Sequence, residues 1–104
     1  MRMLLKVTIP VEAGNAAIKN GTLGPTIQKI LGQLKPEAAY FMESEGQRTG
    51  IIVVDIKNAS DIPGIAEPFF LSFGGRIELH PCMTPADLAA AGPDLERSAK
   101  EYGG

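Results

Sequence analysis

The sequence feature that most constrains the fold is a run of four consecutive aliphatic residues, Ile51 to Val54, between Gly50 and Asp55. Successive side chains of a β-strand point to opposite faces of a sheet, so this strand would present apolar side chains on both faces. A central strand with one face in water would alternate apolar and polar residues instead. The run therefore predicts a central strand whose two faces are both covered.

Three other segments also have the character of strands. Residues 2–10 alternate, with Met3, Leu5, Val7 and Ile9 on one face and Arg2, Leu4, Lys6 and Thr8 on the other. Residues 38–45 and 49–57 are two strand-like runs separated by Gly46-Gln47-Arg48, a suitable length for a hairpin. Residues 76–83 alternate again, with Ile77 and Leu79 on one face and Arg76, Glu78, His80 and Cys82 on the other.

The segments between these strands follow the helical period. Residues 12–34 predict a short helix, a turn at Asn20-Gly21 and a main helix that starts near Thr22 or Gly24 and ends at Lys35-Pro36. A second helical stripe begins after Ser60, a candidate N-cap, and ends at Gly74-Gly75, and Pro68 should kink or split it. Thr84 is the predicted N-cap of a short helix that ends at Gly92-Pro93, and a last helix is expected over residues 93–102.

The predicted order is β-α-β-β-α-β, which is typical of the ferredoxin-like α+β fold. We expect a four-stranded antiparallel sheet with helices on one face and an extra C-terminal helix. A chain of 104 residues is long enough for one hydrophobic core, so residues 1–104 are predicted to form a single domain.

Composition excludes several function classes. The formal net charge is −2, which offers no basic surface for nucleic acid. The single cysteine cannot form an internal disulfide and lacks the spacing of a zinc site, so no metal is expected. Lys6 interrupts the apolar start of the chain, and no segment approaches the roughly 20 apolar residues of a membrane span. These features predict a soluble, cytoplasmic protein that binds neither nucleic acid nor membrane.

The chain resembles the dimeric α+β barrel superfamily in its element order, its length and two segments. These segments are GIIVVDIKNASDI at residues 50–62 and HPCMTPADLAAAG at residues 80–92. Within it, the chain looks similar to small uncharacterised bacterial proteins near the muconolactone isomerase and antibiotic-biosynthesis monooxygenase groups. The resemblance implies a homodimer whose two sheets pack face to face as a barrel, in some members with a small-molecule pocket in each subunit. The superfamily includes cofactor-independent oxygenases, lactone isomerases, haem-handling enzymes and proteins without known activity. No catalytic signature aligns, so no family site residue is carried over.

The candidate site is built from strand facing. In the predicted topology the first strand lies beside the last, so Lys6 and Thr8 would neighbour Glu78 and His80. His80 is the candidate general base, because its ordinary pKa near 6.5 suits proton abstraction next to a carbonyl. Arg76 or Lys6 would stabilise the resulting oxyanion. The alternatives are a structural histidine at the dimer seam and a structural ion pair between Lys6 and Glu78.

Other residues are weaker candidates. Tyr40 could join the pocket from the hairpin, while Cys82 is interpreted as a small buried residue rather than a nucleophile. Glu43 and Glu45 share a strand face but are typical of a solvated hairpin end. The aromatic residues of the second helix, Phe69, Phe70 and Phe73, have the spacing of core residues.

Two functions follow from these observations. The first is a homodimer that binds a small aromatic or enol-type metabolite between the sheet and the helices, without a cofactor. The alternative is a cofactor-independent isomerase, cyclase or monooxygenase that uses His80 as its base. The enzyme requires a cavity that reaches His80, whereas a structural seam would be filled.

Overall fold

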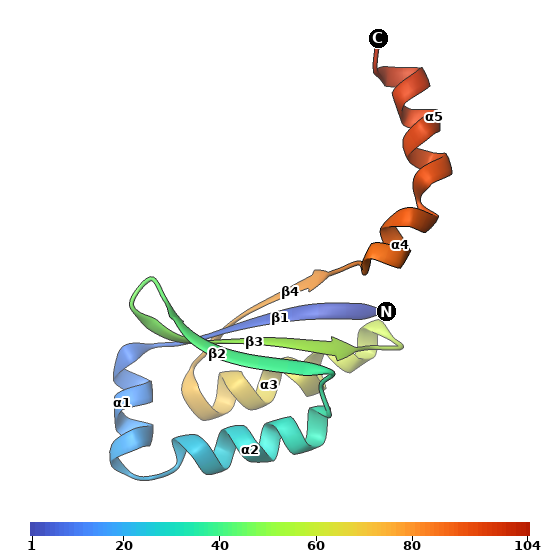
Figure 1. Cartoon of the computed structure of the whole chain (residues 1–104). Helices are drawn as coiled ribbons and strands as arrows, with labels where there is room; N and C mark the ends of the chain where they lie inside the picture. Colours follow the sequence, from blue (N-terminus) through green and yellow to red (C-terminus); the bar gives the residue numbers. More distant parts are fainter.

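A computed structural model describes all 104 residues and confirms an α+β fold with a four-stranded antiparallel sheet (Figure 1). The elements are β1 (Arg2–Ile9), α1 (Val11–Lys19), α2 (Leu23–Leu34), β2 (Ala38–Ser44), β3 (Gln47–Asp55), the 3-10 helix η1 (Ala59–Asp61), α3 (Ile62–Phe73), β4 (Arg76–Pro81), α4 (Pro85–Ala90) and α5 (Gly92–Tyr102). No helix combines the length and the apolar character that crossing a bilayer requires.

The strands are arranged in the order β2-β3-β1-β4, so β1 and β3 are central and β4 lies beside β1, as predicted. The register places Lys6 of β1 opposite Ile51 of β3 and opposite Glu78 of β4. On β2, Tyr40 lies opposite Ile51. Because directly opposed residues share a face, each such row crosses the whole sheet on one side.

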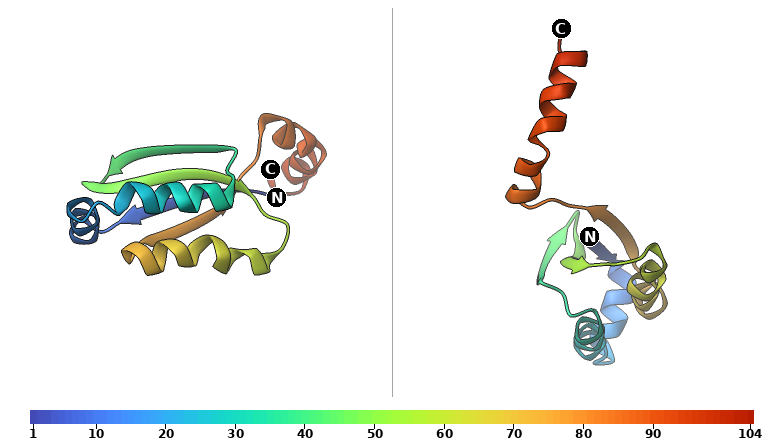
Figure 2. Two further views of the ribbon diagram at one scale, coloured as in Figure 1. Left: turned by 90° about the horizontal axis from the view of Figure 1, so that it is seen from below. Right: turned by 90° about the vertical axis from the view of Figure 1, so that its right-hand side faces the viewer.

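Helices α1, α2 and α3 cover one face of the sheet, and the core lies between them and the sheet (Figure 2). The core contains Met3, Leu5, Val7, Ile9, Ile52 and Val54 from the strands and Ala17, Ile30, Ile65, Phe69 and Phe73 from the helices. Leu5, which is completely buried, lies on the central strand β1. The predicted core role of the α3 aromatics is right for Phe69 and Phe73 but wrong for Phe70, which is 43% exposed.

The hairpin between β2 and β3 is tighter than predicted. Its turn consists of Glu45 and Gly46, whose φ angles are 55° and 75°. Two residues in left-handed conformation give the connection a twist that matches the flanking strands. As a result Gln47 and Arg48, which were predicted to lie in the connection, belong to β3.

The predictions for α3 need two corrections. Its start is organised by Asp61, which accepts hydrogen bonds from the backbone N–H of Asn58 (3.0 Å) and Lys57 (3.2 Å), and Ser60 is not the cap. Pro68 neither splits nor ends the helix, which continues to Phe73. Burial of the apolar side of α3 against the sheet offsets the backbone hydrogen bond that proline removes.

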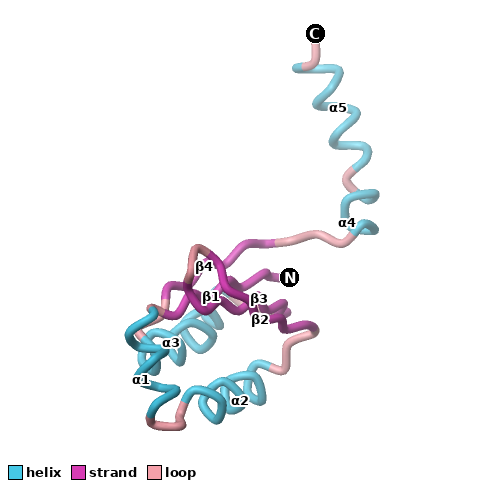
Figure 3. Tube along the Cα trace, turned by 60° about the vertical axis from the view of Figure 1, so that its left-hand side comes forward, coloured by secondary structure: helices cyan, strands magenta, loops and turns pink.

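The chain ends in an arm, residues 82–104, that contains α4 and α5 and projects from the body (Figure 3). The arm rises on the side of the sheet opposite to α1, α2 and α3 (Figure 1). No residue of α4 or α5 is buried, and the molecule measures 59 × 28 × 20 Å. Its radius of gyration is 17.4 Å, whereas a compact chain of this length has about 13 Å. The arm therefore lacks the packing partner that most helices have.

Candidate functional site

The residues predicted to form a site all lie on the face of the sheet that the helices leave uncovered, which we call the open face. Three rows cross it from β2 to β4. They are Ala38-Val53-Leu4-His80, Tyr40-Ile51-Lys6-Glu78 and Met42-Thr49-Thr8-Arg76. Tyr40 and His80 are on opposite edge strands. Three inter-strand spacings of about 4.8 Å separate these two strands by roughly 14 Å. The structure thus brings Lys6, Thr8, Arg76, Glu78 and His80 together at one side and leaves Tyr40 at the other.

His80 is solvent-accessible on β4, with 62% of its side chain exposed. Its Nε2 lies 3.5 Å from Oε1 of Glu78, two residues earlier on the same strand. The predicted ion pair between Lys6 and Glu78 is not formed, although the two residues are directly opposed, because the Glu78 carboxylate lies toward His80 instead. His80 lines none of the three cavities of the molecule, and its role as a base stays a prediction.

An apolar cavity of about 240 Å³ lies on the other face, between the sheet and the helices. Its walls are mainly aliphatic and aromatic. The strands contribute Val7, Ile9 and Ile52, and the helices contribute Leu23, Ile27 and Phe69. This apolar cavity and the residues predicted from strand facing therefore lie on opposite faces of the same sheet.

Phe41 closes the apolar cavity along the edge strand β2. It is the cross-strand partner of Gly50, and a Cβ atom placed on Gly50 would lie 3.2 Å from Cε1 of the Phe41 ring. The ring thus packs over a glycine and remains 56% exposed. Sequence reasoning missed this pair because the strand register was not fixed, although a glycine in a central strand signals close approach of another group.

Arg48 is the one ionisable side chain that lines the apolar cavity. Its Nη2 donates a hydrogen bond to Oδ1 of Asn15 on α1 at 3.1 Å. The guanidinium also lies against Gly14, where a Cβ atom would be only 2.6 Å from Nη1. Arg48 has no carboxylate within ion-pair distance. Its cross-strand partner Glu43 instead accepts a hydrogen bond from the Gly46 N–H at 3.2 Å.

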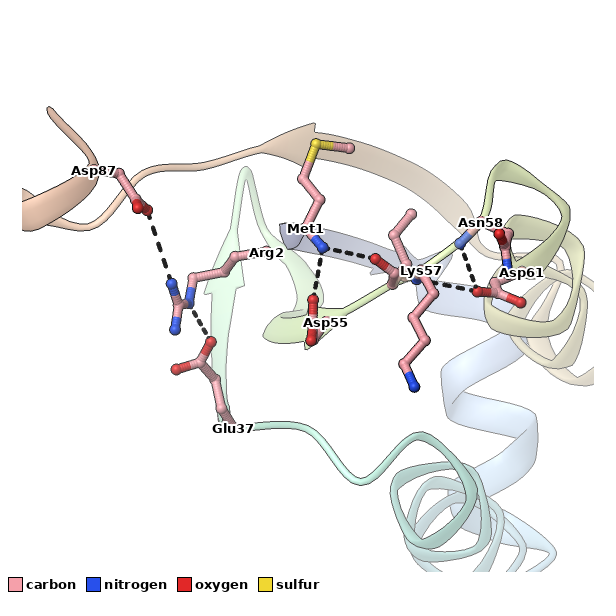
Figure 4. A network of polar contacts seen from close by, with 9 residues as sticks. Met1, Arg2, Glu37, Asp55, Lys57, Asn58, Asp61 and Asp87 are labelled. Carbon is pink, nitrogen blue, oxygen red and sulfur yellow. Dashed lines mark hydrogen bonds and ion pairs between the residues drawn. The ribbon is translucent and has the colours of Figure 1, made fainter. Parts of the chain in front are cut away.

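A larger polar cavity of about 680 Å³ lies where the arm leaves the body. The ammonium group of Met1 contacts Oδ1 of Asp55 at 2.7 Å and donates a hydrogen bond to the Ile56 carbonyl, also at 2.7 Å (Figure 4). This ammonium group lowers the pKa of Asp55 below its ordinary value. Arg2 pairs with Glu37, whose hydrogen bond raises the pKa of the guanidinium.

The same network reaches the arm. Nη1 of Arg2 lies 4.0 Å from Oδ2 of Asp87, the third residue of α4 (Figure 4). The predicted cap of α4 is confirmed, because Thr84 Oγ1 accepts a hydrogen bond from the Asp87 N–H at 3.1 Å, and the Asp87 carboxylate accepts one from the Thr84 N–H at 3.0 Å. The second bond lowers the pKa of Asp87. Each charge in the polar cavity is paired within the chain, and the network reaches the arm through one solvent-exposed contact, between Arg2 and Asp87.

The polar cavity also contains Cys82, which is half-buried rather than buried as predicted. No group of three or more histidine, cysteine, aspartate or glutamate side chains is placed to hold a metal ion. The apolar cavity combines apolar walls with the Arg48 guanidinium, which has no acidic partner. A third cavity of about 380 Å³ is also mainly apolar and is lined by Lys57, which likewise forms no ion pair.

Comparison with known proteins adds little to this picture. No family model and no curated protein matches the chain. Among solved structures the chain is similar to one titled "De novo designed protein Ferredog-Diesel", with a TM-score of 0.46 and 8% sequence identity over 78% of this chain and 85% of that one. A likeness of this strength indicates no function, and the resemblance to the muconolactone isomerase and monooxygenase groups stays a prediction.

Proposed function

We propose that this protein is a homodimer of ferredoxin-like subunits, paired as an α+β barrel, that binds a small aromatic or enol-type metabolite between the sheet and the helices. The observation that carries this proposal is the apolar cavity of about 240 Å³. A dry cavity of about 150 Å³ with similar walls accommodates benzene, while sites for drug-sized ligands start at about 300 Å³. The volume therefore favours a small aromatic ligand of one ring or two fused rings.

The open face supports the homodimer. Its central part is aliphatic, with Leu4, Ile51 and Val53 half-buried, and Tyr40 extends it at 70% exposure. The surrounding charges, Lys6 and Glu78 among them, would form a polar rim. Apolar patches of this kind on small proteins are typical of interfaces. Two copies packed face to face around a two-fold axis would cover both patches at once.

The arm supports the same arrangement. It projects on the open-face side, where a second subunit would lie (Figure 2). Leu95 and Tyr102 are seven residues apart in α5, which places them on one side of that helix, and Leu88 lies on α4, before the break at Ala91. All three are more than half exposed. A partner packed on the open face would give these side chains a surface to bind.

Binding is tested by titrating the protein with phenylpyruvate and 2-naphthol and following the methyl resonances of Ile27 and Val7 by NMR. We expect saturable shifts at these residues. Gly50→Ala, which forces the Phe41 ring to move, should weaken binding about tenfold, whereas Gly32→Ala should not, because a Cβ there meets no atom within 4 Å. If neither compound shifts these resonances, the binding proposal is wrong.

The second candidate is an enzyme in which His80 acts as the base. The contact between His80 and Glu78 favours it, because a carboxylate beside an imidazole can hold the ring in one orientation. In the homodimer this pair would lie near the partner sheet. Loss of turnover of enolisable substrates in His80→Asn, with dimerisation unchanged, would support this candidate, and unchanged turnover would exclude it.

A further inference from the structure

We propose that the metabolite bound in the apolar cavity carries a carboxylate, and that Arg48 binds it. This inference rests on the proposed function, because it specifies the chemical class of the ligand. The apolar walls would hold the ring or chain of the ligand, and Arg48 would hold its charged end. Such a division between apolar walls and one placed polar group is typical of small-molecule sites.

The Arg48 guanidinium has unused hydrogen-bonding capacity. A guanidinium has five N–H donors, and the only protein partner of this one is Asn15 Oδ1 at 3.1 Å. The nearest acidic residue in the sheet register, Glu43, is bonded to the Gly46 N–H and forms no ion pair with Arg48. Arg48 is therefore a half-buried cation without a counter-charge.

The Arg48 guanidinium is also held in place by α1. Asn15 fixes it by a hydrogen bond, and Gly14, which is buried, leaves room for it against the backbone of α1. A Cβ atom at position 14 would lie 2.6 Å from Nη1, so a larger residue there would displace the guanidinium. A planar guanidinium in fixed orientation matches the geometry of a carboxylate, which it can bind through two parallel hydrogen bonds.

Arg48 lies at one end of the apolar cavity. Arg48 lies opposite Ile9, a buried core residue that also lines the cavity. Its side chain leaves the sheet on the covered face and reaches α1, at the end of the cavity next to the hairpin. A ligand with an apolar body in the cavity would therefore present its polar end to Arg48.

The experiment compares trans-cinnamate with its neutral isostere cinnamamide by calorimetric titration of the full chain. We expect cinnamate to bind about 10- to 100-fold more tightly than the amide, which is the usual effect of a charge-assisted hydrogen-bond pair. Arg48→Met should weaken cinnamate binding to the level of the amide and leave amide binding unchanged. Arg48→Lys should retain part of the preference, because it keeps the charge without the two-pronged geometry.

Arg76→Met is the matched control, since this arginine lies on the open face and does not line the cavity. Thermal unfolding of each variant confirms that it is folded. If cinnamate and its amide bind equally and Arg48→Met changes neither, the carboxylate inference is wrong while the cavity proposal survives. If neither compound binds and phenylpyruvate and 2-naphthol also fail, the proposed function itself is wrong.

Discussion

The two faces of the sheet are formed by the same strands but differ in what covers them. On the covered face, Leu5 and Ile52 are buried under helices of their own chain. On the open face, their neighbours Leu4 and Ile51 are equally aliphatic but have nothing above them. The covered face accounts for folding of the single chain, whereas the open face has apolar surface that folding does not bury. The proposed homodimer would account for this difference, with one packing event within the chain and a second between chains.

The largest effect is expected on the covered face. Leu5→Ala should lower the free energy of unfolding by about 2–5 kcal/mol, because it leaves a cavity in the centre of the core. Leu4→Ala, one residue earlier, should cost less than about 1 kcal/mol at low protein concentration. Urea denaturation measures both values. Equal costs at low concentration would mean that the two faces do not differ as described.

The next effect concerns assembly through the open face. Val53→Glu should weaken dimerisation at least 100-fold, because an unpaired charge buried at an interface costs about 3–5 kcal/mol. Light scattering should then show a folded monomer. Leu71→Glu is the matched control, since Leu71 is 83% exposed and belongs to α3, a helix on the other face of the sheet (Figure 1). A dimer that tolerates Val53→Glu would exclude the open face as the interface.

A smaller effect is expected in the arm, which belongs to the open-face side. Thr84→Ala removes the hydrogen bond to the Asp87 N–H and should destabilise α4 by about 1 kcal/mol. The body should remain unchanged. Hydrogen exchange of the α4 amides measures the effect, and Ser98→Ala in α5 serves as a control because Ser98 caps no helix. Unchanged exchange in α4 would show that the cap does not hold it.

The smallest effect is a pH dependence in the same region. The pKa of Asp87 is lowered from its ordinary value of 3.8 by its bond with the Thr84 N–H. A lowered pKa means that the folded arm favours the charged carboxylate, so this stabilisation is fully present well above pH 3.8 and is lost as the pH falls through the folded-state pKa. As the pH falls below 3.8 and then through the lowered folded-state pKa, the start of α4 should fray while the core stays intact. Asp87→Asn should remove this pH dependence from the amide resonances of α4, and its persistence would contradict the assignment.

The period of the sequence was sufficient to predict the covered face. Met3, Leu5, Val7 and Ile9 alternate without interruption, and the run from Ile51 to Val54 identified a central strand, because burial is a direct consequence of facing. The helix ends were also predictable where a single residue type determines them, as at Gly74, whose φ angle is 60°. The predicted split at Pro68 does not occur, because the local cost of the proline is outweighed by packing that a sequence window does not contain.

The residues that line the candidate cavity could not be predicted from the sequence, although a site between the sheet and the helices was expected. The cavity depends on Phe41 lying opposite Gly50, and that pairing depends on a hairpin turn of two residues. With the longer connection that the sequence favoured, Arg48 lay in a loop and no side chain could be assigned to this end of the core. A one-residue error in the turn shifts the register by one residue, which moves every following side chain to the other face of the sheet.

The exposed arm has a consequence for chains that have not found a partner. Helices as short as α4 and α5 are marginal in water when nothing packs against them. In an unpaired subunit the arm would spend much of its time unfolded and accessible to proteases, whereas assembly would shield it. The length of time that residues 82–104 survive digestion would then report how much of the protein is assembled as the proposed homodimer.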